Sequence, residues 1–93
     1  MKALLGNFRS LQQFEGHNGE VKNQFQIFTD KGTAFQSYSS IIAAKVDGKV
    51  YLDENKWDYS TTTGKYRNQF LRETKKETEK KIKSGEYILT DLN

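Results

Sequence analysis

The chain has 93 residues, which is enough for a single domain spanning residues 1–93. It contains no cysteine, so disulfides, iron–sulfur clusters and cysteine-containing zinc sites are excluded. Net charge is +3, and no apolar run approaches the roughly 18 residues that span a bilayer. We therefore expect a soluble, cytoplasmic protein that makes no membrane contact.

The first half of the chain is predicted to form four or five antiparallel strands, beginning with residues 7–14. In the second predicted strand, residues 21–29, apolar side chains recur at the two-residue period of a strand and should share one face. These side chains are Val21, Phe25 and Ile27.

Two hairpin turns are predicted between the later strands. Residues 30–32, Asp-Lys-Gly, fit a three-residue loop with Gly32 in the left-handed conformation. Asp47 and Gly48 separate two β-rich runs, and Asp-Gly in that position is the strongest hairpin signal in the chain.

After Trp57 the pattern changes from a period of two to a period of 3.6, which predicts one long helix. Ser60 or Thr61 would cap its start, and Gly85 would end it in the left-handed conformation. An apolar stripe, diluted by threonine, would pack on the sheet. The stripe consists of Tyr66, Phe70, Leu71, Thr74, Thr78 and Ile82.

Strands followed by a helix indicate an α+β fold. The expected architecture is an antiparallel β-meander of four to five strands with one long C-terminal helix packed on one face. Residues 87–93 form a short apolar tail that could dock either on the sheet or on the helix.

Few residues in the chain suggest catalysis. The single histidine, His17, falls in a predicted turn and is interpreted as solvated. Asp53, Glu54 and Asp58 lie close in sequence but lack the ligand spacing of a calcium loop. No nucleophile elbow or phosphate loop occurs. We therefore expect no enzyme activity, no cofactor, no metal and no catalytic residue.

The segment 65–83 is strongly basic, with eight basic and three acidic residues, whereas the rest of the chain is slightly acidic. This asymmetry favours an anionic partner, although a solvated helix face laced with ion pairs would give the same pattern. The predicted partner-binding residues are Lys65, Arg67, Asn68, Arg72, Lys75, Lys76 and Lys80, and the first four are expected to point outward beside the strand-to-helix joint.

The aromatic residues have two interpretations. Trp57, Tyr66 and Phe70, which surround the strand-to-helix joint, are expected to be structural. The aromatics of the predicted strands could form a base-stacking platform, but core packing is favoured in a chain short of leucine and valine. This second group is Phe25, Phe28, Phe35, Tyr38 and Tyr51.

The block WDYSTTTGKYRNQFL at residues 57–71 resembles a family of small uncharacterised proteins encoded by bacteriophages and prophages. The blocks EVKNQFQIFTDKG and KIKSGEYILTDLN extend the resemblance over most of the chain. The resemblance transfers no residue role, but it implies a phage or mobile-element product acting in the bacterial host cytosol.

Two functions remain open at this point. The preferred one is a non-enzymatic protein that binds a host protein, such as an inhibitor of a bacterial defence system of the anti-CRISPR or anti-restriction type. The alternative is a nucleic-acid-binding accessory protein that uses the basic helix 65–83.

Overall fold

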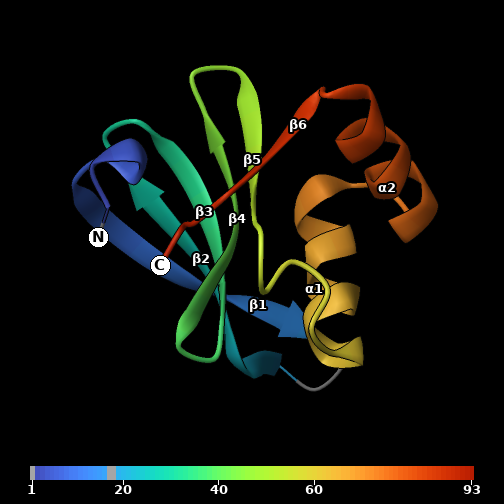
Figure 1. Cartoon of the computed structure of the whole chain (residues 1–93). Helices are drawn as coiled ribbons and strands as arrows, with labels where there is room; N and C mark the ends of the chain where they lie inside the picture. The colour runs from blue at the N-terminus through green and yellow to red at the C-terminus, as the bar shows by residue number, and fades with distance from the viewer. Residues whose placement is uncertain (1, 17–18) are drawn as a thin grey trace.

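Six strands form one sheet, in the order in which they occur along the chain (Figure 1). The computed structural model describes residues 2–16 and 19–93, so the interpretation of His17 lies outside the described residues. The strands are β1 (Phe8–Gly16), β2 (Gly19–Thr29), β3 (Gly32–Ser37), β4 (Ser40–Val46), β5 (Lys49–Asp53) and β6 (Tyr87–Thr90). The helices are the 3-10 turn η1 (Ala3–Leu5), α1 (Thr61–Leu71) and α2 (Lys75–Ser84).

The predicted fold class is wrong in its sheet. Strands β1 to β5 do form an antiparallel meander, but β6 adds to β5 in parallel and makes the sheet six-stranded and mixed. The residues that form β6 were part of the tail whose docking site the sequence left open. A parallel neighbour needs a long crossover connection, and the two helices between β5 and β6 supply it.

The single long helix is also wrong, because the chain forms two short helices. Arg72 ends α1 in the left-handed conformation, with φ of 59°. Thr74 then caps α2: its hydroxyl accepts from the Glu77 backbone N–H, and the Glu77 carboxylate accepts from the Thr74 N–H. This capping box satisfies two backbone donors at once and starts a new helix at Thr74. The sequence prediction had instead placed Thr74 within the apolar stripe of one continuous helix.

The outer helix ends follow the sequence prediction. The Ser60 hydroxyl caps α1 by accepting from the Thr63 N–H, and Gly85 ends α2 with φ of 85°. No helix in the part of the chain that the structure describes is long and apolar enough to cross a membrane.

One predicted turn is confirmed and the other is wrong. Asp47 and Gly48 have φ of 52° and 76°, as the two-residue hairpin between β4 and β5 requires. Gly32 instead lies in β3 outside the left-handed region, opposite Val46. It is glycine for another reason: a Cβ there would collide with the Lys45 carbonyl oxygen of β4.

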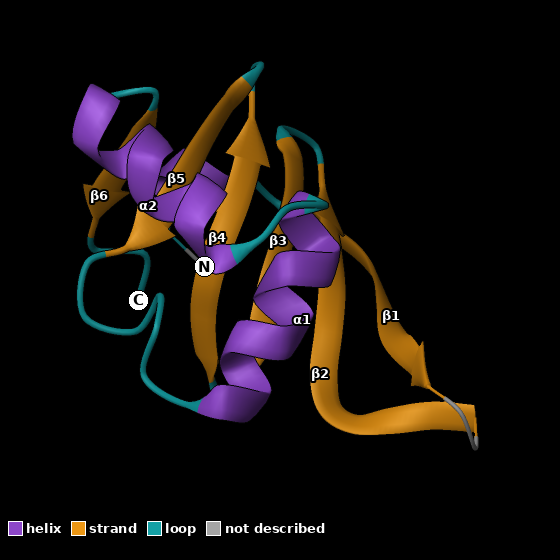
Figure 2. Cartoon of the chain, turned by 90° about the vertical axis from the view of Figure 1, so that its right-hand side faces the viewer, coloured by secondary structure: helices purple, strands orange, loops and turns teal. Residues whose placement is uncertain are grey.

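The sheet has a buried core on each of its faces. Helices α1 and α2 lie across one face (Figure 2), and η1 and the segment after β6 lie on the other (Figure 1). The helix-side core is Phe35, Ile42, Ala43, Leu52, Tyr66, Phe70, Leu71 and Tyr87. The second core is Leu5, Ile27, Ala34, Ile41, Ala44, Val46 and Leu92.

The two cores decide where the aromatics and the second predicted strand belong. Tyr66 and Phe70 are buried as expected, and Trp57 packs half-buried against them. Val21 packs on the helix-side core and Ile27 in the second core, so they do not share a face. The reason is Asn23, whose φ of 65° interrupts the alternation of β2.

The strand aromatics offer no continuous exposed platform among the described residues. Phe35 lies in the core, and Tyr38 is exposed in the turn after β3. The remaining three, Phe25, Phe28 and Tyr51, are half-buried.

Two glycine-to-alanine changes should move stability in opposite directions. Gly64 lies inside α1, where an added Cβ would make ordinary contact with the Arg67 guanidinium at 3.6 Å, so G64A should stabilise the fold by about 0.5–1 kcal/mol. G32A should destabilise it clearly, because the Lys45 backbone cannot move without disturbing β4. Urea unfolding of both variants measures this, and a destabilised G64A would contradict the packing of α1.

Candidate partner-binding surface

Arg67 lies inside the joint between β5 and α1, and only 1% of it is exposed. Its Nη1 donates to the Trp57 carbonyl at 2.8 Å and to Asp58 Oδ1 at 3.0 Å. Its Nη2 donates to Asn68 Oδ1 at 3.0 Å, and the guanidinium lies 5.1 Å from the Trp57 ring centroid. The prediction that Arg67 points outward is therefore wrong. Its guanidinium is turned inward and forms charge-assisted hydrogen bonds with acceptors of the joint.

Asp58 connects this joint to the second helix. Its Oδ1 accepts from Arg67, and its Oδ2 lies 2.7 Å from Lys75 Nζ at the start of α2. Burial alone would raise the pKa of Asp58, but the hydrogen bonds from Lys75 and Arg67 outweigh burial and hold that pKa below its ordinary value. One carboxylate thus neutralises two of the predicted binding cations.

Glu73, between the two helices, neutralises a third cation. Its side chain is 3% exposed, and its carboxylate accepts from Lys81 Nζ at 2.7 Å. It also accepts from the Thr78 hydroxyl at 2.6 Å and the Tyr87 hydroxyl at 2.8 Å. Burial would raise the pKa of Glu73, yet these donors lower it below its ordinary value of 4.5. The contact fixes β6, which carries Tyr87, to the helix linker.

Three lysines of α2 face solvent together. Lys76, Lys80 and Lys83 recur at i, i+4 and i+7, opposite the buried Thr78, and all are exposed. Among the described residues they take part in no ion pair within 4.0 Å. We call these three residues the lysine stripe.

A groove lies on α1 and the start of α2, and none of the three lysine-stripe residues lines it. It is open to solvent, has a volume of about 610 Å³, and carries hydroxyls, an amide and charged groups. It is lined by Asp58, Ser60, Thr61, Gly64, Lys65, Arg67, Asn68 and Lys75. Of these, Lys65 is exposed and keeps its charge free of any carboxylate among the described residues.

The structure separates the seven predicted binding residues into three groups. Lys65, Arg67, Asn68 and Lys75 line the groove, and Lys76 and Lys80 belong to the lysine stripe. Arg72 stands apart at the end of α1. Burial lowers the pKa of Lys45, and the nearby positive charge of Arg72 lowers it further.

The prediction missed Lys83 and Asp58. The spacing of Lys76, Lys80 and Lys83 could have identified Lys83. Asp58 is close enough in sequence to Arg67 to be considered as its acceptor, but no sequence signal indicates that it also binds Lys75.

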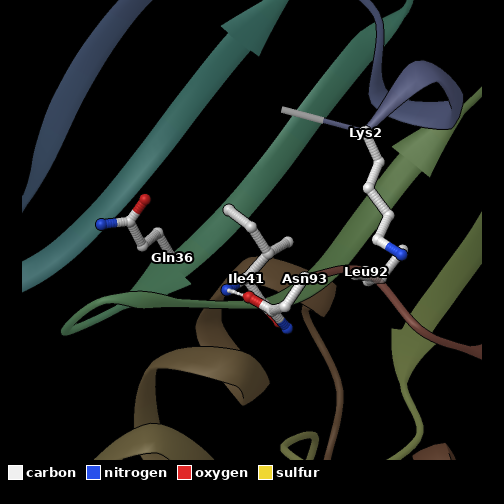
Figure 3. Close-up of a pocket in the computed structure, with 5 residues that line it drawn as sticks. All are labelled: Lys2, Gln36, Ile41, Leu92 and Asn93. Carbon is white, nitrogen blue, oxygen red and sulfur yellow. Dashed lines mark hydrogen bonds between the residues drawn. The ribbon is translucent and has the colours of Figure 1, made fainter.

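A second cavity, of about 430 Å³, lies on the opposite face of the sheet (Figure 3). It is lined by Lys2, Gln36, Ile41, Leu92 and Asn93. The Asn93 amide accepts from the Ile41 N–H at 2.7 Å and donates to the Ile41 carbonyl at 3.0 Å. These polar groups hold residues 91–93 against β4, so we assign the cavity a packing role.

The fold and the basic surface define a small α+β protein with an open mixed sheet and two cationic helices on one face. A profile of the family of unknown function DUF8033 matches residues 9–86, and the chain belongs to this family. The comparison with curated proteins and the comparison with solved structures each gave no significant match.

Replacing Glu73 with Gln should change stability in a pH-dependent way. Because the folded pKa of Glu73 lies below its ordinary value of 4.5, its contribution is present above that pH and is lost as pH falls through the folded pKa. We expect E73Q to lower the free energy of unfolding by about 1–3 kcal/mol at neutral pH. The difference in free energy of unfolding between wild type and E73Q should become smaller in acid.

The matched control is E86Q at an exposed glutamate near the end of α2. It should follow the wild-type curve at every pH, since exposed substitutions usually change stability by less than about 0.5 kcal/mol. Urea unfolding from neutral to acid pH measures both variants, and a pH-independent E73Q deficit would argue against the buried ionised carboxylate.

Proposed function

We propose that the protein is a non-catalytic binding protein that recognises an acidic surface of another protein through the lysine stripe and the groove on α1. The observation that carries this proposal is how the charges are divided. Arg67, Lys75 and Lys81 are held by Asp58 and Glu73. The lysine stripe and Lys65 remain for a partner, on two helices that those same carboxylates lock in place.

The chemistry of the groove suits binding. Its carboxylate, Asp58, is engaged by two cations, and its pKa is held low, so it is a poor proton acceptor. The groove instead offers the Thr61 hydroxyl and the side-chain NH2 of Asn68 beside the Lys65 ammonium. Such a surface can hydrogen-bond and neutralise carboxylates of a partner.

A protein partner is favoured over a nucleic acid because the field of the surface is moderate. Nucleic-acid affinity depends mainly on the number of phosphates neutralised. Here Glu77 and Glu79 lie on the same helix as the lysine stripe. Interleaved charges of this kind select a complementary protein pattern more readily than a uniform row of phosphates.

The biological setting of the proposal rests on the resemblance to phage and prophage proteins. In that setting the partner is a protein of the bacterial host cytosol, and the narrower form of the proposal is inhibition of a host defence protein of the CRISPR or restriction type. Covering a site on such a protein requires binding without chemistry, which a rigid surface supplies.

The experiment compares two triple variants with the same loss of charge. K76Q/K80Q/K83Q removes the lysine stripe, whereas K22Q/K31Q/K49Q removes three exposed lysines of the sheet and its turns. Tagged proteins are used to capture partners from nuclease-treated bacterial lysate, and the affinity of the purified complex is then measured. We expect a stoichiometric protein complex that the stripe variant loses and the control variant keeps.

Binding to single- and double-stranded DNA and RNA at about 150 mM salt gives the opposing outcome. Submicromolar affinity for any of them, abolished in the stripe variant and steeply weakened by salt, would replace the protein partner with a nucleic acid. Equal capture by both triple variants would contradict the use of the stripe.

A further inference from the structure

Strand β1 forms one edge of the sheet and, among the described strands, pairs only with β2. It is nine residues long, and its outer side presents backbone groups that no other strand of the sheet uses. Phe8 is 57% exposed and Leu11 is 49% exposed. A long edge with exposed apolar side chains invites another strand, and proteins normally shorten, cover or charge such edges.

A bulge gathers the two exposed apolar side chains on one face. Phe8 lies opposite Thr29 and Leu11 opposite Ile27, with the register shift at Arg9 between them. Thr29 and Ile27 are two residues apart and so share a face, which places Phe8 and Leu11 on that face as well. Ile27 belongs to the second core, so this apolar edge continues that core outward.

The charges of β1 are complementary to a second copy of the same strand. Its only charged residues are Arg9 and Glu15, placed symmetrically about Gln12. In an antiparallel pairing centred on Gln12, Arg9 of each copy lies opposite Glu15 of the other. The pairing makes two opposite-charge contacts and brings no like charges together, an arrangement that favours cross-strand pairing.

Geometry also favours this edge over the other one. Strand β6, at the far edge, has four residues and no charged side chain. Joining β1 of one copy to β6 of the next would be a head-to-tail contact that leaves edges free at both ends and continues into a filament. Pairing β1 with β1 places a two-fold axis at Gln12, buries both edges and closes the assembly.

We propose that β1 is a self-association site at which two copies of this chain pair antiparallel and continue the sheet across a two-fold axis. The interface combines backbone hydrogen bonds, the Phe8 and Leu11 side chains, and the reciprocal Arg9–Glu15 contacts. It lies on the sheet edge and does not use the lysine stripe, so it stands or falls independently of the proposed function.

Sedimentation equilibrium over a range of protein concentrations tests the site. The wild-type chain should show a reversible monomer–dimer equilibrium. L11K should raise the dimer dissociation constant by at least roughly tenfold, since it places like charges across the axis. The matched control is L89K, at an exposed leucine of the other sheet edge, which should leave the constant unchanged.

A charge swap distinguishes pairing from general loss of stability. R9E and E15R should each weaken the dimer, and R9E/E15R together should restore it, while melting curves of dilute monomer stay alike. A mass of one chain at every concentration would overturn the proposal, as would a dimer sensitive to L89K, or a double variant as weak as the singles. A monomer whose capture of another protein depends on Leu11 would assign the edge to that partner's strand and also overturn it.

Discussion

The buried Arg67 guanidinium is the contact on which the arrangement of sheet, helices and basic surface depends. An arginine cannot lose its charge in a protein, so burying it requires acceptors around it. The chain supplies acceptors for Nη1 and Nη2 locally, from the Trp57 carbonyl, the Asp58 carboxylate and the Asn68 amide. These contacts fix the direction in which the chain leaves β5 and enters α1. The Trp57 ring covers the guanidinium, which explains why the lone tryptophan stands at this joint.

From that joint the electrostatic connections extend to the second helix. Asp58 binds both Arg67 and Lys75, which lies at the start of α2. Glu73 binds both Lys81, in the second half of α2, and Tyr87 of β6. Two acidic side chains therefore connect the joint, both helices and the parallel edge strand. The same contacts determine which cations remain free, so the proposed binding surface is a consequence of how the fold is held together.

The sequence predicted much of the local structure, because local structure follows local rules. The Asp47–Gly48 hairpin and the Ser60 and Gly85 caps each depend on a few adjacent residues. Strand β6 depends instead on pairing between Val50 and Tyr87, which are far apart in sequence, and a four-residue apolar run does not reveal its neighbour. The helix break was missed because threonine is compatible both with the interior of the predicted apolar stripe and with an N-cap position. Only Glu77, three residues later, distinguishes the N-cap from a position inside a helix.

The exposure of two candidate surface lysines follows from the helical period, whereas Arg67 was assigned to the surface from its charge alone. Lys76 and Lys80 face solvent as the helical period requires. Arg67 lies four residues before Leu71 and one after Tyr66, on the buried side of the same helix. The helical period therefore predicted a buried side chain, whereas the charge of arginine suggested an exposed one. When the two disagree, nearby acceptors decide, and Asp58 and Asn68 were close enough in sequence to be considered.

Urea unfolding of R67A beside K65A tests the central role of Arg67 most directly. Both variants remove one cation from α1, but Lys65 is exposed whereas Arg67 is buried among its acceptors. Removing Arg67 should lower the free energy of unfolding by about 3 kcal/mol, because the partly buried Trp57 carbonyl and the Asp58 carboxylate lose their donor. Removing Lys65 should change it by less than about 0.5 kcal/mol. Equal stability of the two variants would contradict the account, since the joint would then hold its shape without the guanidinium.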